Sequence, residues 1–248
     1  MSNTVIIIPS RLAAKRLPNK PLKLIHNKEL ILHVHEIAKK SQVGEVLVTT
    51  PDKSIYDLIN KKGGKSFISK TNHQTGTDRV FEGFEKFFSC KPNLIINLQG
   101  DMPNLNPNSI IEINNYLKKG LCDIATLASK INDKAEIENT NIVKVKTDGD
   151  IEKSGFSKAI DFKREISPDD GDFVYHHIGI YGFTKEALIR YVSFKRSKLE
   201  IERNLEQMRA FENNLSIHVG YSTSNPLGVD TEEDLKSIKK MMENNAKR

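Results

Sequence analysis

Four cations follow the first apolar run of the chain, and their types and spacing suit the binding of an anion. Residues 5–9 read Val-Ile-Ile-Ile-Pro, and Arg11, Lys15, Arg16 and Lys20 come after them. Grouped guanidinium and ammonium ions bind polyanions, most simply a nucleoside triphosphate. The alternative is a basic loop that only faces water. These four residues alone leave both interpretations open.

A carboxylate occupies a comparable position after another apolar run. Asp101 follows Gln99-Gly100, directly behind the run Leu94–Leu98. A carboxylate at the carboxyl end of a strand, after a glycine that permits close approach, is well placed to bind Mg²⁺. An Asx turn explains the same residue equally well.

A third candidate is the segment 72–79, which precedes a helical pattern. It contains Thr75 and Gly76, and a helix N-terminus behind a glycine can bind an anion. We expect Thr77 or Asp78 to cap this helix. An ordinary capped helix start, without a ligand, is the alternative.

Hydrophobic periodicity predicts the elements that position these residues. Buried strands are expected over 5–9, 45–50, 66–69 and 94–98. Helices are expected over 28–40, 52–62, 78–88 and 106–119. Pro18 and Pro21 argue against a helix after the first strand, so the cations lie on a loop. The alternation predicts an α/β fold with a doubly wound, mostly parallel, Rossmann-like sheet, in which ligands bind where the strands end.

The pattern changes after residue 121. Strands are expected over 123–129, 142–146, near Ile151, over 174–183 and over 217–219. The turn signal Asp148-Gly149 indicates antiparallel pairing, and 163–172 reads as a loop. Helices are expected over 184–192 and 199–212, and Thr231 with Asp234 resembles a capping box for a last helix. We therefore expect one domain over 1–248, with an antiparallel subdomain over about 121–175.

Composition excludes several classes of protein. The 248 residues are 38% apolar and 28% charged, as in a soluble protein, and no apolar run is long enough to span a bilayer. No signal peptide is recognisable, so we expect a cytoplasmic protein. Cys90 and Cys122 fit neither a metal motif nor a disulfide. The net charge of +6 is spread widely, which argues against a nucleic-acid partner.

The cationic segment also resembles a family signature. It stands as Ile8-Pro9-Ser10-Arg11 and Arg16–Leu22, and it is similar to the pattern I-P-A-R-x-x-S-x-R-L-P-x-K-P-L of the 3-deoxy-manno-octulosonate cytidylyltransferases, or CMP-Kdo synthetases. Further blocks of that family follow in order: His73–Arg79, Gln99–Asp101, Asn141–Val145, His177–Tyr181, Leu205–Arg209 and Gly228–Asp234. The resemblance covers nearly the whole chain.

The resemblance implies a nucleotidyltransferase with a nucleotide-diphospho-sugar transferase-like fold. Such an enzyme joins CTP to the acid sugar 3-deoxy-D-manno-octulosonate (Kdo), giving CMP-Kdo and pyrophosphate for lipopolysaccharide synthesis. It also implies Mg²⁺ as the cofactor and a homodimer whose subunits meet through the antiparallel part. The expected partners are CTP and Kdo, with no nucleic acid and no membrane.

The resemblance also assigns roles to residues. The catalytic set comprises Arg11, Lys20, Asp101 and Asp230, with Asp101 and Asp230 as the metal ligands. The nucleotide-binding set comprises Pro9, Arg11, Arg16, Lys20, Thr75, Gly76, Arg79 and Gln99. The sugar-binding set comprises Arg79, Lys158, His177, Tyr181, Glu206 and Gln207. Arg79 stands in two sets because a phosphate and the sugar carboxylate suit it equally.

Some positions depart from the family pattern, and several roles have simpler alternatives. Lys158 replaces a usual Arg, Met102 a common Glu, and Arg203 a usual Glu. His177 and Tyr181, four apart on a strand, also fit a structural pair on one face. Two other functions stay open at this point: a cytidylyltransferase for another, sialic-acid-like sugar, and a nucleotide-binding module without catalysis.

Overall fold

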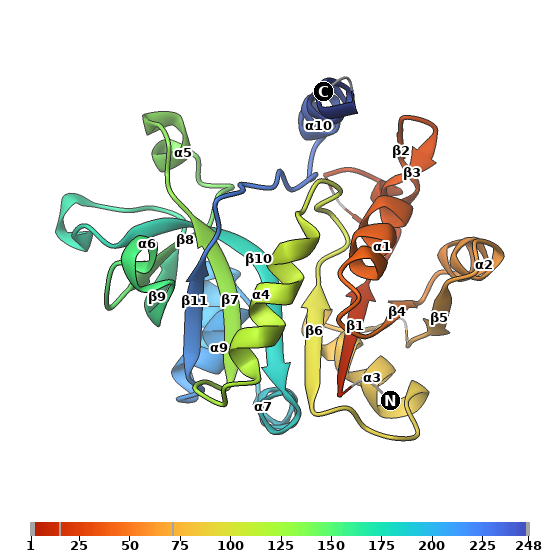
Figure 1. Cartoon of the computed structure of the whole chain (residues 1–248), viewed down its shortest axis with the longest axis horizontal. Helices are drawn as coiled ribbons and strands as arrows, with labels where there is room; N and C mark the ends of the chain where they lie inside the picture. The colour runs from red at the N-terminus through yellow and green to blue at the C-terminus, as the bar shows by residue number, and fades with distance from the viewer. Residues whose placement is uncertain (1–2, 15, 71, 247–248) are drawn as a thin grey trace. The chain divides into compact units, whose positions relative to one another are not determined.

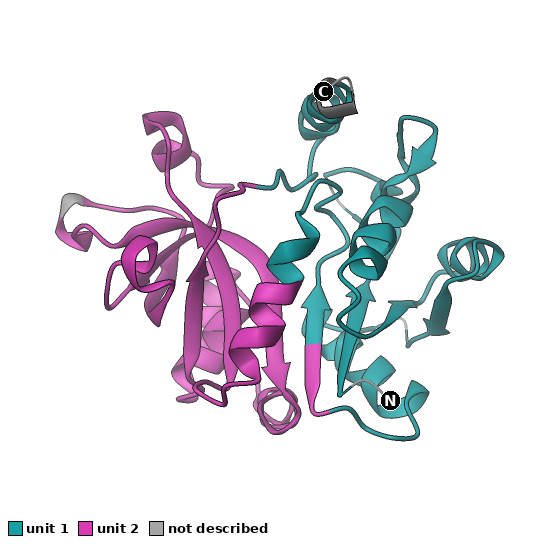
Figure 2. Ribbon diagram, in the orientation of Figure 1, with its two compact units in different colours: residues 1–92, 96–110, 226–248 teal, residues 93–95, 111–225 magenta. Residues whose placement is uncertain are grey.

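The computed structural model describes residues 3–14, 16–70 and 72–246. The chain forms an α/β fold that divides into two compact units (Figures 1 and 2). The first unit contains residues 1–92, 96–110 and 226–248, and the second contains 93–95 and 111–225. The second unit thus extends beyond the expected subdomain at both ends. Lys15 of the cationic segment lies outside the described residues.

The first unit holds the predicted parallel strands. Its strands, in sheet order, are β5 (Lys65–Ile68), β4 (Glu45–Thr50), β1 (Thr4–Pro9) and β6 (Leu94–Leu98), of which residues 94 and 95 belong to the second unit. β1 pairs with β4, and β4 with β5, in parallel. All six residues of β1 are buried, as its β-branched composition predicts. The helices of this unit are α1 (Leu30–Lys40), α2 (Lys53–Lys61), α3 (Gly76–Phe87) and α10 (Glu232–Ala246), while α4 (Pro107–Leu117) begins here and ends in the second unit.

A small hairpin replaces the start of the helix expected over 28–40. It pairs β2 (Leu24–Ile25) with β3 (Lys28–Glu29) in antiparallel fashion. His26 and Asn27 both have positive φ, which is the backbone that a two-residue hairpin turn requires. The helix therefore begins only at Leu30.

The start of α3 also differs from the prediction of Thr77 or Asp78 as N-cap. Thr75 is the N-cap, and its hydroxyl accepts from the backbone N–H of Asp78. The Asp78 carboxylate in turn accepts from the backbone N–H of Thr75, which completes a capping box. Gly76 is therefore the first helical residue and not part of the preceding loop.

The second unit is mostly antiparallel. Its strands, in sheet order, are β10 (Val174–Thr184), β7 (Ile124–Ser129), β11 (Ile217–Tyr221), β9 (Phe156–Lys163) and β8 (Lys144–Thr147). β10 is antiparallel to β7 and β8, and β9 is antiparallel to β8 and β11, whereas β11 runs parallel to β7. The helices are α5 (Lys134–Glu138), α6 (Ile151–Ser154), α7 (Lys185–Ser193), α8 (Lys198–Arg203) and α9 (Gln207–Glu212). Short 3₁₀ turns lie at Lys20–Leu22 in the first unit and Pro168–Asp170 in the second.

Two predictions for the second unit were wrong. The run around Ile151 is the helix α6 and not a strand, because the Asp150 side chain caps its N-terminus and Gly155, with positive φ, ends it. The helix expected over 199–212 is two helices. Asn204 lies between them in the left-handed conformation, which ends α8.

One lysine of the second unit is fully buried. Lys144 on β8 has no exposed surface, and its Nζ donates to the carbonyl oxygens of Asn139 and Arg164, both at 2.7 Å. Burial and the charge of Arg164 lower the pKa of the Lys144 ammonium. This side chain ties the loop before β8 to the end of β9.

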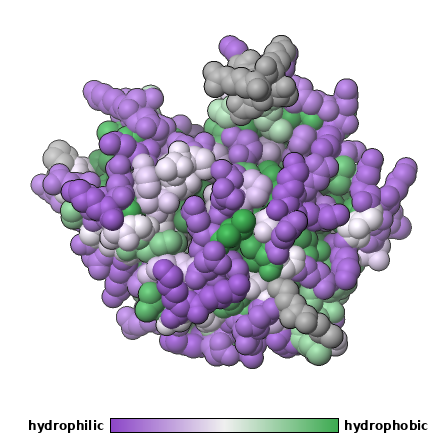
Figure 3. All heavy atoms as spheres, viewed as in Figure 1, coloured by the Kyte–Doolittle hydropathy of each residue, from purple (hydrophilic) through white to green (hydrophobic). Residues whose placement is uncertain are grey.

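The surface is mostly hydrophilic, as the high share of charged residues in the sequence predicts. Hydrophilic residues cover most of the face seen in Figure 3, with smaller hydrophobic areas between them. Among the described residues, no helix is long and apolar enough to cross a membrane. Cys90 is exposed and Cys122 buried, and both are free thiols.

Candidate active site

A cavity of about 750 Å³ lies in the first unit, where the predicted nucleotide-binding residues meet. Its walls include all eight of them: Pro9, Arg11, Arg16, Lys20, Thr75, Gly76, Arg79 and Gln99. Asp101 and Asp230 line the same cavity. The structure therefore brings together side chains that are up to about 220 positions apart in the sequence, on one face where β1 and β6 end.

Backbone contacts hold the cationic loop against the sheet. The N–H of Ser10 donates to the Thr49 carbonyl at 2.9 Å, which extends the pairing of β1 and β4. The N–H of Leu12 then donates to the carboxylate of Asp52 at 2.8 Å. Asp52, at the start of α2, was not singled out from the sequence, because its partner is a backbone group 40 positions away.

The carboxylates of Asp101 and Asp230 converge on one ammonium ion. Lys20 Nζ donates to Asp101 Oδ2 at 3.1 Å and to Asp230 Oδ1 at 3.0 Å. Burial opposes the charged form of Lys20, but the two carboxylates outweigh it and raise the pKa of the ammonium. The guanidinium of Arg16 donates to the other oxygen of Asp230 at 2.8 Å. Two negative charges thus lie side by side and are neutralised by two cations of the loop.

Local geometry explains why these two aspartates meet. A Cβ added to Gly100 would lie 3.2 Å from the Pro9 carbonyl oxygen, a tight contact with a backbone atom that glycine avoids where β6 ends. The N–H of Val229 donates to the carbonyl of Asp101 at 2.9 Å, which holds the two segments together. The capping box of Thr231 with Asp234, predicted from the sequence, is present and begins the last helix directly after Asp230.

Arg79 belongs to the same cavity. It is 3% exposed, and its guanidinium donates to the Lys70 carbonyl at 3.0 Å and to the Ser69 hydroxyl. Burial and the neighbouring charge of Arg11 lower the pKa of the Arg79 guanidinium. Two guanidinium groups that repel each other in a cavity suit a ligand with several negative charges.

A chain of buried polar groups leads to Gln99. Gln99 Nε2 donates to Asn97 Oδ1 at 3.1 Å, and Asn97 Nδ2 donates to Thr77 Oγ1 at 3.1 Å. Asn97 is fully buried in a strand that is otherwise apolar. That polar residue was the sequence signal for this contact, and it was overlooked. These two hydrogen bonds hold the Gln99 amide in a single orientation.

The loop before α3 is held by one carboxylate. Glu82 accepts from the backbone N–H of Lys70 at 2.8 Å, from His73 Nε2 at 2.6 Å and from Lys86 Nζ at 2.9 Å. Burial opposes the charged carboxylate, but these three hydrogen bonds outweigh it and lower the pKa of Glu82 to about 2. The negative charge of Glu82 therefore contributes to the position of the loop that leads to Thr75.

We expect Glu82→Gln to destabilise the protein by about 1–2 kcal/mol at neutral pH. An unpaired glutamate titrates near pH 4.5, whereas folded Glu82 keeps its charge to about pH 2. Its stabilisation is complete above pH 4.5 and is lost as the pH falls toward 2. Urea unfolding of the variant and the wild type across that range checks this. Glu85→Gln, on the exposed side of the same helix, is the control, and an equal loss in both variants would contradict the role of Glu82.

Two of the predicted sugar-binding residues, His177 and Tyr181, lie on β10 in the second unit, where this strand carries a bulge. Ile178 pairs with Leu127, but Tyr181 pairs with Thr126, so Gly179 and Ile180 are extra residues on this strand. Two extra residues preserve the alternation, and His177 and Tyr181 point to one face as predicted, with ring centroids 5.4 Å apart. Both side chains are buried, at 8% and 6% exposure.

Glu206 and Gln207 were expected in mid-helix, but they begin α9. Glu206 is the N-cap position, and Gln207 is the first helical residue. Burial and the charge of Glu206 raise the pKa of Tyr181 well above its usual value. The Tyr191 hydroxyl donates to the Glu206 carbonyl at 2.9 Å.

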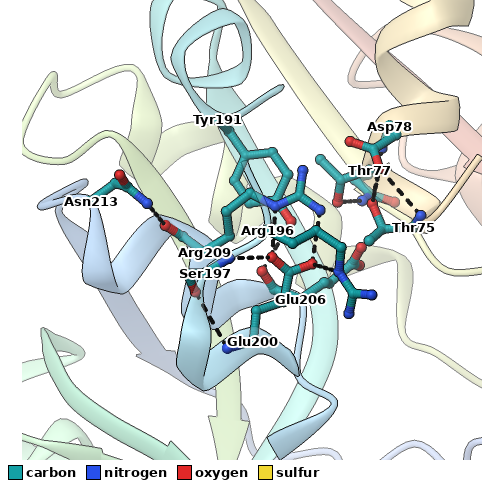
Figure 4. A network of polar contacts seen from close by, with 11 residues as sticks. Thr75, Thr77, Asp78, Tyr191, Arg196, Ser197, Glu200, Glu206, Arg209 and Asn213 are labelled. Carbon is teal, nitrogen blue, oxygen red and sulfur yellow. Dashed lines mark hydrogen bonds and ion pairs between the residues drawn. The ribbon is translucent and has the colours of Figure 1, made fainter. Parts of the chain in front are cut away.

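A buried ion pair supports this start of α9 (Figure 4). Arg209 Nε and Nη2 donate to the two oxygens of Glu200, each at 2.8 Å, and both side chains are almost fully buried. Arg196 donates to Glu200 as well, at 2.9 Å. The Arg209 guanidinium lies 4.6 Å from the centre of the Tyr191 ring. α8 and α9 are joined through this cluster.

The structure does not bring Lys158 to the other sugar-binding candidates. Lys158 is exposed on β9 and lines a different hollow, together with Asp148 and Ser216. Arg203, another departure from the family pattern, has an evident structural partner. Its guanidinium donates to the Asp161 carboxylate and to the Phe162 carbonyl on β9.

The donor set of the cavity is compatible with Mg²⁺. Mg²⁺ is commonly held by one or two carboxylates, with the remaining positions taken by phosphate oxygens and water. Asp101 and Asp230 provide two carboxylates within reach of one cation. Over the described part of the chain, no cluster of three or more His, Cys, Asp or Glu side chains could hold a metal. Any metal here would therefore depend on a substrate for most of its ligands.

The fold and the cavity agree with a known class of enzymes. The sequence profile of the cytidylyltransferase family matches residues 5–217, and the chain is thus a member of the cytidylyltransferase class. A solved structure of CMP:2-keto-3-deoxy-manno-octonic acid synthetase complexed with CTP is 30% identical, has a TM-score of 0.87, and is matched over 98% of this chain and 99% of that one. Within the class, the chain belongs to the 3-deoxy-manno-octulosonate cytidylyltransferase family, as two curated relatives show.

The relatives match over nearly their full length. The 3-deoxy-manno-octulosonate cytidylyltransferase of Bartonella tribocorum is 39% identical over 239 residues, which are 96% of this chain and 98% of the relative. That of Rickettsia canadensis is 39% identical over 247 residues, 99% of this chain and 98% of the relative. The 4-diphosphocytidyl-2C-methyl-D-erythritol synthase of Anaerococcus prevotii, 14% identical with a TM-score of 0.64, shares the fold.

Proposed function

We propose that this protein transfers the CMP group of CTP to Kdo, giving CMP-Kdo and pyrophosphate. The observation that carries the proposal is the cavity of the first unit, where four cations and two carboxylates meet on residues that match the family signature. The full-length similarity to curated 3-deoxy-manno-octulosonate cytidylyltransferases supports Kdo as the acid sugar. The reaction would supply lipopolysaccharide assembly, in the cytoplasm.

In this proposal the cationic loop binds and orients the triphosphate. Arg11, Arg16 and Lys20 neutralise phosphate charge as it shifts toward the leaving pyrophosphate. Arg79 assists them, because it lies in the same cavity and its guanidinium is repelled by the charge of Arg11. We therefore assign Arg79 to the phosphates and not to the sugar carboxylate. Gln99, held by Asn97, contacts the nucleotide.

We further propose Mg²⁺ as the cofactor, with Asp101 and Asp230 holding it. When bound, the ion would neutralise phosphate charge and lower the pKa of an attacking hydroxyl. Lys20 bridges the two carboxylates. A second role of Lys20 is therefore to keep these like charges together before the substrate binds.

In the second unit, His177, Tyr181, Glu206 and Gln207 would bind sugar hydroxyls. Tyr181 and Glu206 supply a donor and an acceptor, as hydroxyl groups require. Lys158 is the least supported member of the predicted set, because it lines another hollow. We leave it out of the proposed sugar site.

A pyrophosphate-release assay tests the function. The protein is incubated with CTP, Mg²⁺ and one acid sugar at a time, with Kdo and a sialic acid as the two main substrates. We expect release with Kdo and none after chelation of the metal with EDTA. Faster release with the sialic acid would identify another acid-sugar cytidylyltransferase. Binding of CTP without release from any sugar would indicate a nucleotide-binding module instead.

We also expect the protein to be a homodimer, as the resemblance implies for the antiparallel part. Size-exclusion chromatography with light scattering should give a mass twice the 28.1 kDa of one chain. A single-chain mass at assay concentrations would contradict this expectation, and it would leave the proposed reaction unaffected.

A further inference from the structure

The side chain of Thr126 occupies the bulge of β10 and contacts three polar atoms there. Thr126 is fully buried on β7. Its Oγ1 lies 2.7 Å from the carbonyl oxygen of Ile180, 3.2 Å from that of Ile178 and 2.9 Å from Nε2 of His177. The bulge explains the two carbonyl groups, because extra residues on a strand leave the regular ladder locally disrupted.

A hydroxyl carries a single proton, and this limits how the three contacts can be made. An oxygen–oxygen distance of 2.7 Å to a carbonyl requires a proton between the two atoms, which only Thr126 can supply. Thr126 therefore donates to the Ile180 carbonyl. Its contact with His177 must then run in the other direction, with the ring nitrogen donating and the hydroxyl oxygen accepting.

We infer that Thr126 is a positioning residue that holds neutral His177 in the tautomer with its proton on Nε2, so that Nδ1 presents a lone pair to a sugar hydroxyl. The assignment rests on the proposed function only for the identity of the ligand. The ligand class is a polyhydroxylated acid sugar, whose hydroxyl groups can donate to an unprotonated ring nitrogen.

Two further observations agree with this assignment. Burial and the neighbouring His176 lower the pKa of His177 to about 3, so the ring carries one proton at neutral pH. Nδ1 of His177 has no hydrogen-bond partner among the residues that the structure describes. The ring is packed edge-on against Phe162 and lies beside Tyr181, which fixes its plane.

The tautomer can be measured without any activity assay. Long-range ¹H–¹⁵N correlation spectra of protein labelled at histidine nitrogen separate protonated from unprotonated ring nitrogens. At neutral pH we expect the His177 signals of an Nε2-protonated ring, with Nδ1 in the unprotonated range. A His177 ring protonated on Nδ1 in the folded wild type would overturn the inference, whatever the enzyme's substrate is.

Two variants connect the tautomer to sugar binding. Thr126→Val has nearly the same shape but no hydroxyl, whereas Thr126→Ser keeps the hydroxyl. We expect Thr126→Val to show a mixture of His177 tautomers and to raise KM for the acid sugar about tenfold, with KM for CTP unchanged. Thr126→Ser should resemble the wild type in both readouts.

The controls separate a positioning role from a structural one. A purely structural role would lower the melting temperature of Thr126→Val without changing the ratio of the two KM values or the ring signals, and this would overturn the inference. If Thr126→Val does not fold, the inference is still tested by the tautomer of His177 in the wild-type spectrum and by whether Thr126→Ser keeps that tautomer. If no acid sugar is a substrate, the proposed function fails, but the tautomer result stands by itself.

Discussion

Replacing Asp101 with Asn should reduce pyrophosphate release by at least about a thousandfold and leave the fold intact. Among the described residues that line the cavity, Asp101 and Asp230 are the two carboxylates, and both contact Lys20. Asparagine has nearly the same shape as aspartate and can still form hydrogen bonds, but it lacks the negative charge that a divalent cation requires. Asp101 is about one third exposed, so the free energy of unfolding should change by less than about 1 kcal/mol.

The matched control is Asp57→Asn. Asp57 is an exposed carboxylate on α2 that pairs with Lys53 four residues earlier. The same chemical change there should alter neither turnover nor stability. Turnover of Asp101→Asn at the wild-type rate would exclude a metal-binding role for this carboxylate, and unfolding of the variant would show that its role is structural.

Glu200→Gln should lower the free energy of unfolding by about 3–5 kcal/mol. Glu200 is 1% exposed and accepts two hydrogen bonds from the Arg209 guanidinium, which is itself 3% exposed. A glutamine would leave the Arg209 charge buried without its main counterion. Urea unfolding measures the loss. The start of α9 should also move, so KM for the acid sugar should rise more than KM for CTP.

Glu202→Gln is the matched control for this experiment. Glu202 lies on the same helix, half exposed, and faces Lys198 at 3.7 Å. Its removal should cost less than about 0.5 kcal/mol. The double variant Glu200→Leu with Arg209→Met, which buries no charge, should be more stable than Glu200→Gln. Equal stability of Glu200→Gln and Glu202→Gln would contradict the importance of the ion pair.

Much of the first unit could be predicted from the sequence, because its strands are short buried runs. The β-branched residues of β1 and the apolar run of β6 specify strands without help from distant parts of the chain. The second unit was harder to predict. Ile151 is apolar and follows a turn signal, which favoured a strand. The side chain of Asp150 instead caps a short helix that begins at Ile151. The break at Asn204 depends on one residue in the left-handed conformation, which a helical pattern does not reveal.

The candidate site was predicted where residues match a motif, and missed where it depends on long-range contacts. The convergence of Asp101 and Asp230 was expected from the family motif. Asp230 lies in the segment before α10 and not at the end of a strand, and the hydrogen bond from the Val229 N–H to the Asp101 carbonyl holds the two segments together. The roles of Asp52, Asn97 and Thr126 depend on backbone groups or hydroxyls far away in the sequence. Such contacts leave no periodic signal, and only a polar residue within an apolar strand indicates them.

The buried ammonium of Lys144 allows local opening of the second unit to be measured by chemical modification. An amine-acylating reagent reacts with unprotonated, accessible lysine side chains. The exposed lysines of this chain should therefore react without any opening of the structure. Lys144 cannot do so while its Nζ is enclosed and bonded to the carbonyls of Asn139 and Arg164. Its acylation requires that the segments carrying these two carbonyls, before β8 and after β9, move away from it. The rate of that single modification therefore measures how often this part of the native sheet opens.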